Sequence, residues 1–539
     1  MIKLAGPPLR FGVMCGRRGL SKWQAAAVRE LIESGNGKPA LLIVDPTNQL
    51  AGQRDVGCFL WRLFCRFNRP ASSETAAALE ELHGVPELTC RFNREGSAES
   101  FTHQDVASIQ SYDLDFILHF DFGDIKGGVL ESARHGVWSF RLGDDERDRG
   151  TPPYFWEIYY GDLISSAVLL RLTERRDTDV ALRRGFIKTL DYSYCRNYDR
   201  LALEAAHWPN YVASAIRAGA YVELDPNERA TPAHHSPSNL NMVRFIWMLA
   251  RNIVQRVVQR CTRQEWNIGI VPLSVEELAS GTPITQVHWF ANPPDGWVAD
   301  PMARSHDGLV DVLCERMDLA TGQGYIAALS FDGKSWSPDT PAIRTGCHAS
   351  YPYLIEDEGQ IFCVPETCEA NELALYVAVE FPAAWKRVGT VLPGFPAVDS
   401  TLFKFEGRWW LFATSREASG YKLFAWFANS LLGPWQPHGA NPIKVDERSS
   451  RPAGPPFWFH GELFRPAQDC SKTYGGRVVL NRILRLTPTD FSERPERFVE
   501  PVPGSLYGKA LHTLSGAGPY TVIDGARWRL QWPGSLNGP

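Results

Sequence analysis

The sequence predicts a multidomain protein of mixed class, with an α/β domain followed by an all-β domain that forms a five-bladed β-propeller. Three observations lead to this prediction. The 539 residues are too many for one hydrophobic core. Strand-like and helical segments alternate over residues 9–222, whereas Trp, Phe, Tyr and Val alternate with polar residues from about 265 to 535. In that second half a pattern recurs about every 50 residues, the length of a four-stranded propeller blade.

The N-terminal part, residues 1–222, is expected to contain a mostly parallel sheet. Its predicted strands are residues 9–15, 40–44, 114–119 and 136–141. Ser21 is placed to cap a helix that runs to about Ser34, and a further helical stretch is expected to end at Arg134. In such a sheet, ligands bind at the carboxyl ends of the strands. No G-x-G-x-x-G follows the first strand, which argues against a dinucleotide site.

Residues 223–264 are predicted to be a linker followed by a connecting helix. Three Pro and many small polar residues prevent regular structure up to residue 240. Apolar residues then recur at helical spacing from Met242 to Val257, with Arg251, Arg256 and Arg260 among them. We expect this helix to pack on a domain, and the alternative is a helix that lies on a membrane surface.

The C-terminal part, residues 265–539, is expected to contain five blades. Its repeating units begin near residues 297, 348, 396, 456 and 505. The first three units open on Val298-Ala-Asp300, Ser350-Tyr351-Pro352 and Val398-Asp399-Ser400, and each then meets a turn and a second apolar run. Because equivalent positions of successive blades face one axis, these polar residues are predicted to converge on a common site.

Composition and charge exclude several classes of function. The net charge is −5 and there is no basic block, so nucleic acid is not expected to be a main partner. No apolar run reaches 18 residues, and the N-terminus lacks a signal-peptide core. The eleven Cys are scattered and include no CxxC pair. We therefore expect reduced thiols in a cytoplasmic protein, with no membrane span and no metal site.

One stretch of the N-terminal part resembles the folate-dependent formyltransferases. The resemblance rests on three motifs, Gly136-Val-Trp-Ser-Phe-Arg141, Arg149-Gly-Thr-Pro-Pro-Tyr-Phe-Trp156-Glu-Ile-Tyr-Tyr-Gly161-Asp162 and Asp177-Thr-Asp179. It implies a Rossmann-like formyltransferase-type domain over roughly residues 10–190. The family's catalytic Asn, His and Asp correspond to Ser139, Arg141 and Asp177 here, so only the Asp is kept.

That altered trio leaves several functions open for the N-terminal part. Formyl transfer needs a base with a near-neutral pKa and an amide donor, and Arg141 cannot lose its proton at pH 7. Arg141 beside Asp177 could instead hold a phosphate or a carboxylate. The domain could also be a structural or partner-binding remnant. If formyl transfer is retained, the resemblance implies 10-formyltetrahydrofolate as cofactor and an amino sugar as acceptor.

The second half resembles two groups of sugar-processing propellers. Trp297-Val-Ala-Asp300-Pro301 is similar to the start of the five-bladed arabinanases, xylosidases and invertase-like enzymes, in which this Asp is catalytic. The whole half also resembles the propeller domain of plant glucosamine inositolphosphorylceramide transferases. That resemblance is carried by Ala299-Asp300-Pro301, Tyr351-Pro-Tyr353, Val364-Pro-Glu366-Thr367, Val398-Asp399-Ser-Thr401, Arg465-Pro-Ala-Gln-Asp469, Tyr474-Gly475 and Leu511-His512-Thr513.

Three carboxylic acids are the candidate catalytic residues. A glycosidic bond is made or cleaved through an oxocarbenium-like state, which needs one carboxyl group as acid and another as base or nucleophile. We predict Asp300 as base or nucleophile, Glu366 as acid, and Asp399 as an orienting or pKa-tuning group. The predicted substrate-binding residues are Tyr351, Arg465, Gln468, Asp469, Tyr474 and His512. Tyr351 stands where the glycosidases offer a second Asp, which is a departure from a plain hydrolase.

The leading functional hypothesis is therefore a carbohydrate-active enzyme, with glycosyl transfer ahead of hydrolysis. The resemblance implies a role in making a surface polysaccharide or a glycolipid, with a sugar or sugar nucleotide as substrate and no required cofactor. The alternatives are an N-formyltransferase acting on an amino sugar, and a non-catalytic glycan-binding or scaffold protein. The sequence makes no prediction of the oligomeric state.

Overall fold

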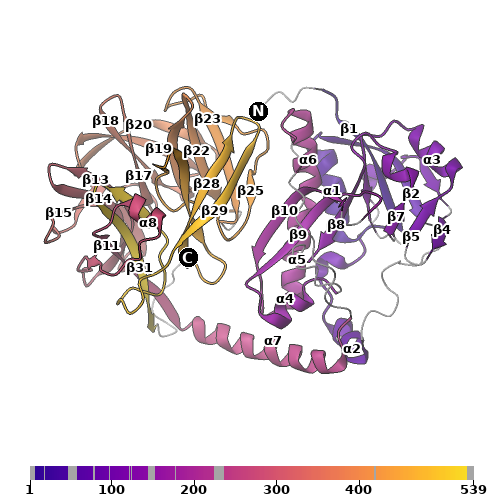
Figure 1. Ribbon diagram of the computed structural model, residues 1–539, viewed down its shortest axis with the longest axis horizontal. Coiled ribbons are helices and arrows are strands. Elements are labelled where there is room, and N and C mark those ends of the chain that lie inside the picture. The colour runs from indigo at the N-terminus through magenta and orange to yellow at the C-terminus, as the bar shows by residue number, and fades with distance from the viewer. Residues whose placement is uncertain are drawn as a thin grey trace. The chain divides into compact units, whose positions relative to one another are not determined.

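The structure is a computed structural model, and it forms two compact units that divide between Arg256 and Val257. It describes residues 6–530 except for 17–18, 46–57, 77–78, 91, 96–97, 121, 123, 144–151, 176–177, 222, 224–235 and 418–419. Figure 1 shows the α/β unit in indigo to magenta and the all-β unit in magenta to yellow. Each unit is described by itself.

The N-terminal unit is built on a seven-stranded sheet in the order β10-β9-β8-β6-β1-β2-β3. Its strands are β1 (Leu9–Gly16), β2 (Gly37–Asp45), β3 (Glu87–Thr89), β6 (Phe116–His119), β8 (Val137–Leu142), β9 (Ile164–Arg171) and β10 (Val180–Lys188). The five strands β3, β2, β1, β6 and β8 run parallel, while β9 and β10 pair antiparallel. The expected mostly parallel sheet is therefore present.

Helices and a small second sheet pack on the large sheet. The helices up to the end of this unit are α1 (Lys22–Glu33), α2 (Phe59–Phe67), α3 (His103–Gln110), α4 (Phe155–Tyr160), α5 (Tyr194–Ala206) and α6 (Trp208–Arg217). Helix α1 contacts α5 and α6, and those two helices contact β9 and β10. A separate apolar cluster joins strands β1, β2 and β6 to α3 and to a sheet of β4 (Phe92–Glu95), β5 (Ala98–Phe101) and β7 (Asp124–Lys126).

The helical stretch expected to end at Arg134 is the one wrong element prediction in this part of the unit. The chain there forms the short strand β7 and then a 3-10 helix over Gly128–Glu131. Gly127 separates the two with φ at 81°, a left-handed conformation that stops helix propagation. The local pattern of apolar residues is compatible with a helix, but Gly127 and the adjacent Gly128 interrupt it.

The connecting helix forms as α7 (Asn239–Gln259) and packs on the N-terminal unit. Met242 and Phe245 are fully buried against Trp61 of α2 and Phe155 of α4. Phe155 and Phe245 stack with ring centroids 4.4 Å apart. Among the helices of the described ranges, none is both long enough and apolar enough to cross a membrane.

The C-terminal unit is a five-bladed β-propeller, as predicted. Blade one comprises β13 (Gly296–His306), β14 (Leu309–Asp318), β15 (Gln323–Phe331) and β16 (Thr340–Ile343). Blade two comprises β17 (Ser350–Asp357), β18 (Gln360–Glu366), β19 (Glu372–Glu380) and β20 (Ala384–Pro393). Blade three comprises β21 (Ala397–Phe405), β22 (Arg408–Ser415), β23 (Lys422–Ala428), β24 (Gln436–Pro437) and the added β25 (Lys444–Val445). Blade four comprises β26 (Phe457–Phe459), β27 (Glu462–Asp469), β28 (Arg477–Leu486) and β29 (Phe491–Val499).

The fifth blade is made from both ends of the propeller sequence. It joins β11 (Thr262–Val271) and β12 (His288–Trp289) to β30 (Leu514–Ala517) and β31 (Tyr520–Leu530). Strand β11 pairs antiparallel with β31 along its whole length, from Thr262↔Leu530 to Val271↔Thr521. A unit that simply began near 505 was therefore incomplete. Pairing the first strand with the last closes the ring and leaves no open sheet edge between the ends.

Tight turns join the first two strands in four of the blades. Each turn has two successive residues with positive φ, namely Asp307-Gly308, Glu358-Gly359, Glu406-Gly407 and His460-Gly461. This conformation is that of the type I′ turn, whose twist matches the twist of antiparallel strands. Three of these turns were visible in the sequence, and they fix where each inner strand ends.

Candidate active site

Asp300, Tyr351 and Asp399 occupy equivalent bulges on the inner strands of the first three blades. In β13 the pairing with β14 skips from Ala299↔Glu315 to Met302↔Leu313, so Asp300 and Pro301 lie opposite one residue. The same shift occurs between Ser350 and Tyr353 in β17, and between Val398 and Thr401 in β21. The repeating motif in the sequence is thus a repeated β-bulge, a device that re-aims side chains near functional sites.

At these bulges the three residues have a backbone conformation that residues other than glycine rarely adopt. Asp300, Tyr351 and Asp399 have φ angles of 52°, 41° and 51°, in the left-handed region. Such a conformation is costly for a residue other than Gly and persists only where the surroundings enforce it. Its recurrence in three blades indicates that the backbone is built to present these side chains.

Asp300 lies at one end of a buried chain of acidic and imidazole groups. Its Oδ1 is 3.2 Å from Nε2 of His512 and accepts a hydrogen bond of 3.0 Å from the Thr513 hydroxyl. Nδ1 of His512 is 2.6 Å from Oδ2 of Asp524. Asp524 also accepts backbone N–H bonds from Asp300, His512 and Thr513. The imidazole therefore bridges two carboxyl groups contributed by opposite ends of the propeller.

Burial and charge determine the pKa values of Asp300 and His512 in this series of groups. Burial raises the pKa of Asp300, although the neighbouring His512 opposes the shift. Burial alone would lower the pKa of His512, but Asp524 and Asp300 outweigh it and raise the pKa. His512 is thus held as an imidazolium near neutral pH, and Asp300 becomes a carboxyl group that exchanges its proton near neutrality.

Asp399 lies in a second polar cluster that shares Glu366. Its Oδ2 is paired with Nε of Arg451 and accepts a hydrogen bond of 2.8 Å from the amide of Gln468. The backbone N–H of Asp399 donates to Oε2 of Glu366 over 2.9 Å. These contacts fix the position of the Asp399 carboxylate and tie it to the last residue of β18.

Glu366 is the group best placed to hold a proton at neutral pH. Burial, followed by the negative charge of Asp399, raises its pKa to about 8. Asp300 adds a smaller contribution of the same sign, so the three carboxyl groups influence one another. Pairs of acids whose environments separate their protonation states are the pattern of acid–base catalysis.

We expect Glu366→Gln to remove a pH dependence of propeller stability. In the folded protein Glu366 keeps its proton up to about pH 8, whereas the unfolded chain loses it near the ordinary value of 4.5. The native state therefore binds the extra proton between these values, and the free energy of unfolding falls as pH rises through the window, by roughly a few kcal/mol.

The measurement is urea unfolding of wild type and Glu366→Gln at several pH values from 4.5 to 8. The variant should show a flatter profile than wild type. The exposed Glu356, in the same blade, provides the control as Glu356→Gln, which should keep the wild-type slope. Equal slopes for wild type and Glu366→Gln would contradict the shifted pKa.

Tyr351 is buried rather than open to a substrate. Its hydroxyl accepts a hydrogen bond of 2.7 Å from the backbone N–H of Gly454 and lies 3.3 Å from the hydroxyl of Thr401. The hydroxyl group therefore has partners within the protein both as an acceptor and as a donor of hydrogen bonds. The structure places Tyr351 as a link between blades, at the bulge position that Asp300 and Asp399 occupy in the first and third blades.

Tyr474 lies between the two polar clusters. Its ring is 5.4 Å from the ring of His512 and 4.9 Å from the guanidinium of Arg451, centroid to Cζ. It also meets Trp266 of β11 edge-on at 6.1 Å. Being 40% exposed, Tyr474 keeps an accessible surface beside the buried groups, as a residue that contacts a sugar would need.

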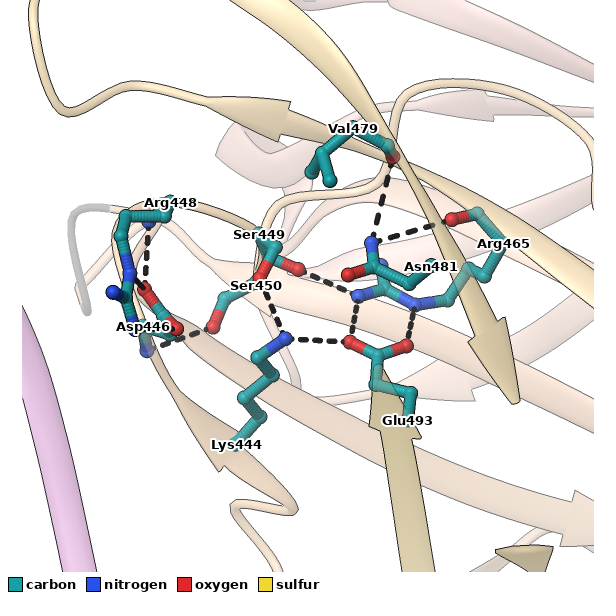
Figure 2. A network of polar contacts seen from close by, with 9 residues as sticks. All are labelled: Lys444, Asp446, Arg448, Ser449, Ser450, Arg465, Val479, Asn481 and Glu493. Atoms are coloured by element: carbon teal, nitrogen blue, oxygen red, sulfur yellow. Dashed lines mark hydrogen bonds and ion pairs between the residues drawn. The ribbon is translucent and has the colours of Figure 1, made fainter. Parts of the chain in front are cut away.

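Arg465 and Asp469, two of the predicted substrate-binding residues, are paired with other groups than those of these clusters. Figure 2 shows Arg465 in a separate network, where Nε and Nη2 bind the two carboxylate oxygens of Glu493 at 2.8 and 2.6 Å. Lys444 binds the same carboxylate at 2.7 Å. Burial would raise the pKa of Glu493, but these cations outweigh it and lower the pKa to about 2. Asp469 is paired with Arg477 at 2.9 Å.

Strand geometry explains why Gln468 and Arg465 separate. Successive side chains of β27 point to opposite faces, so residues 465 and 469 share one face and residue 468 takes the other. Only Gln468 reaches Asp399, while it also donates to the carbonyl of Pro452 over 2.9 Å. Proximity in the sequence had grouped residues that the strand divides.

Several residues of the site were missed by the sequence analysis. Arg451 and Asp524 lie outside the repeating motif, and each reaches its partner only through the ring closure or a neighbouring blade. His348 was missed as well, with Nε2 3.2 Å from Oε1 of Glu315 and a pKa raised by that hydrogen bond. Arg451 follows two serines and precedes a proline, and nothing in that context distinguishes it from a loop residue.

Asp300, His512 and Asp524 are also spaced so that a metal ion could be considered. One ligand atom from each lies within 4.8 Å of the others, and within the described residues they are the one such group. The two nitrogens of His512, however, each contact a different carboxyl group. Because both nitrogens of the ring are directed at carboxylates, neither is directed at a point that a metal ion could share with them. These contacts therefore favour a series of hydrogen-bonded groups that exchange protons over a metal site.

The N-terminal unit contains a separate pocket where β6 and β8 end. Its volume is about 540 Å³, and Ser139 and Arg141 line it together with His119 and Asp179. Arg141 Nη2 is 3.5 Å from Oδ2 of Asp179, whereas the predicted partner Asp177 lies outside the described residues. Nδ1 of His119 is 3.0 Å from the hydroxyl of Ser139. An imidazole is therefore present in this pocket, from the strand next to the one that was expected to supply it.

Comparison with known proteins gives a match over part of the propeller, which includes Asp300, Glu366 and Asp399 but not His512 or Asp524. Residues 283–502 match the family model described as "Glucosamine inositolphosphorylceramide transferase 1, N-terminal". The chain is 38% identical over 210 residues to glucosamine inositolphosphorylceramide transferase 1 of Oryza sativa subsp. japonica, over 38% of this chain and 28% of that protein. The relative of the same description from Arabidopsis thaliana is 36% identical over 208 residues, 37% of this chain and 27% of that protein. The match thus spans a little over a quarter of the length of these curated relatives.

Solved structures with related shapes are much more distant in sequence. A family 117 glycoside hydrolase from Zobellia galactanivorans is 10% identical with a TM-score of 0.33, and covers 50% of this chain and 91% of that chain. Glycinamide ribonucleotide transformylase 1 from Symbiobacterium toebii is 14% identical with a TM-score of 0.29, and covers 42% of this chain and 97% of that chain.

Proposed function

We propose that the propeller catalyses glycosyl transfer in the synthesis of a glycolipid or a surface polysaccharide. The observation that carries the proposal is the grouping of Asp300, Glu366 and Asp399, two of them on equivalent bulges, with Glu366 protonated at neutral pH. The similarity of residues 283–502 to proteins named as glucosamine inositolphosphorylceramide transferases supports the same class of chemistry.

The roles follow from the contacts of each carboxyl group. The acceptor hydroxyl oxygen forms a bond to the anomeric carbon of the donor while the bond from that carbon to the leaving-group oxygen breaks. Asp300, titrating near neutrality beside His512, takes the proton of the acceptor hydroxyl. Glu366 supplies a proton to the leaving-group oxygen, and Asp399, fixed by Arg451 and Gln468, orients the site.

The experiment is a transfer assay with the purified full-length chain. Sugar nucleotides that carry hexoses or hexosamines would be combined with inositol phosphate lipids and with other lipid-linked acceptors, and products identified by mass spectrometry. We expect a product one sugar heavier than an acceptor, formed at least about a hundredfold more slowly with Asp300→Asn. If only free sugar is released, the enzyme is a hydrolase; if neither product forms with any donor, the glycosyl-transfer proposal fails.

We propose a reducing compartment, the cytoplasm, as the place of this reaction. The eleven cysteines are all among the described residues, and none forms a disulfide. Sugar nucleotides as donors fit the same compartment. Fractionation of cells that produce the full chain, with blotting of each fraction, tests this proposal.

A second candidate function is N-formyl transfer by the N-terminal unit, and one observation favours it. The pocket beside Ser139 and Arg141 contains the imidazole of His119, which can serve as the base that Arg141 cannot provide. The cofactor would be 10-formyltetrahydrofolate and the acceptor an amino sugar.

Calorimetry with a stable analogue of 10-formyltetrahydrofolate tests this second candidate. Binding by the wild type, lost in His119→Ala and retained in the exposed-surface variant His103→Ala, is the expected result if the pocket is a folate site. Absence of binding by wild type removes the candidate and leaves the propeller proposal unaffected.

A further inference from the structure

Helices α2 and α7 of the N-terminal unit carry large apolar side chains on their outer side. Phe59, Leu63 and Phe67 of α2 are exposed, as are Leu240, Trp247 and Val254 of α7, and we call these six residues the α2–α7 face. Phe67 is 77% exposed and Leu240 79%, values far beyond those of a packed side chain. Residues 240, 247 and 254 are seven apart, so they line one side of α7 over four turns.

The opposite side of α7 is the one that packs on the protein. Met242, Phe245 and Met248 are buried, and the amide of Asn252 donates to the carbonyl of Asp191 over 3.1 Å. The helix is therefore apolar on two sides, and the N-terminal unit uses only one of them. A stripe of exposed apolar side chains of this length marks an interaction surface.

The two helices are in direct contact with each other. The backbone N–H of Leu60 donates to the side chain of Asn239 over 3.1 Å, at the start of both helices. Phe64 of α2 meets Phe245 of α7 edge-on at 5.8 Å. Figure 1 shows α2 at the N-terminal end of α7.

Charge distinguishes what this surface binds. Neither helix contains an Asp or Glu, whereas both carry exposed arginines, Arg62 and Arg66 in α2 and Arg244 and Arg251 in α7. The whole chain has a net charge of −5, so these arginines are opposite in sign to the net charge of the chain. The arginines stand beside the apolar residues, with Arg251 placed 5.5 Å from the ring of Trp247.

We propose that the α2–α7 face docks the protein on an anionic lipid surface. Aromatic and aliphatic side chains that insert at the boundary between head groups and acyl chains, flanked by arginines that bind lipid phosphates, are the physical requirements of an interfacial helix. A protein partner would need acidic and apolar groups spaced to match this stripe. An anionic lipid surface supplies phosphates and acyl chains everywhere, so it needs no such matched spacing. The inference does not depend on the reaction of the propeller.

The test is co-sedimentation of the full-length protein with vesicles of phosphatidylcholine alone or mixed with phosphatidylglycerol. We expect binding to the anionic vesicles, weakened by raising the salt concentration, and little binding to the neutral ones. Trp247→Glu combined with Val254→Glu should lower the binding constant at least about tenfold, because each change places a carboxylate in the apolar stripe.

A matched control uses an exposed tryptophan of the propeller. Trp458→Glu changes a residue that is 55% exposed on β26 and should leave vesicle binding unchanged. Thermal melts establish that each variant is folded. Equal binding by wild type and the double variant overturns the proposal, and so does an absence of binding to both vesicle types. Concentration-dependent dimerisation that the double variant abolishes would assign the face to self-association instead.

Discussion

Replacing Asp300 by asparagine is expected to lower the rate of glycosyl transfer by about 10²–10⁴-fold, the usual contribution of a general base. Asparagine keeps the size of the side chain and tolerates the left-handed φ of 52° at this bulge. The hydrogen bond from Thr513 also has an acceptor in the new side chain. The substitution removes the ability to accept a proton, together with the negative charge that pairs with His512.

The pH profile of the rate distinguishes the proposed roles. Burial brings the pKa of Asp300 to about 7 and that of Glu366 to about 8. A base must be deprotonated and an acid protonated, so the rate should rise as pH passes about 7 and fall beyond about 8. Asp300→Asn should lose the rising limb, and Glu366→Gln the falling one.

A matched control is available on the same strand–turn unit. Asp307 also has a positive φ, of 47°, but lies exposed in the turn after β13. Asp307→Asn should keep the wild-type rate and melting temperature. If Asp300→Asn retains more than about a tenth of the wild-type rate, Asp300 is not a base in this reaction.

Replacing Arg451 by methionine should destabilise the propeller by about 3–5 kcal/mol, because it leaves the Asp399 carboxylate buried without its cation. The amide of Gln468 remains as a donor to Asp399, and it cannot compensate a full charge. The methionine side chain preserves most of the packing of the arginine stem, so the loss reports mainly on charge.

A double-mutant cycle with Asp399→Asn isolates this interaction. If the charge is responsible, Asp399→Asn should recover part of the stability that Arg451→Met loses. Arg304→Met is the control, because Arg304 is paired with the exposed Glu356 at 3.3 Å and its loss should cost about 1 kcal/mol or less. Urea unfolding that resolves the two units gives the measurement. The N-terminal transition should be unchanged, and an equal loss in all three variants would contradict the assignment.

Local signals in the sequence were sufficient for most of the propeller. Turns such as Asp307-Gly308 and Glu406-Gly407 favour type I′ hairpins through φ preferences of individual residues, so strand ends could be placed without knowledge of distant contacts. The bulge residues Asp300, Tyr351 and Asp399 were found for the same reason, since the motif recurs at the same point in each of the first three blades. The composite fifth blade could not be found in this way, because β11 and β31 pair across about half of the chain.

The formyltransferase-like motif in the N-terminal part illustrates a different limit. Ser139 and Arg141, two residues of this motif, line a pocket of the N-terminal unit, and the resemblance itself stays a prediction. It could not indicate that His119, on the adjacent parallel strand, lies opposite Ser139, because strand register is decided by the whole sheet. The motif therefore gave no indication of the His119 imidazole, which lies on a different strand from the motif residue it contacts.

The sequence by itself determined the architecture of the second half and three of its central residues, because turn and bulge preferences are properties of short segments. The tertiary structure alone decided which polar groups meet. Because side chains alternate between the two faces of β27, Arg465 binds Glu493 on one face and Gln468 binds Asp399 on the other. His512 and Asp524 reached Asp300 only because the last strands close the ring beside the first blade. Contacts between residues more than 200 positions apart depend on that closure, and no local preference encodes it.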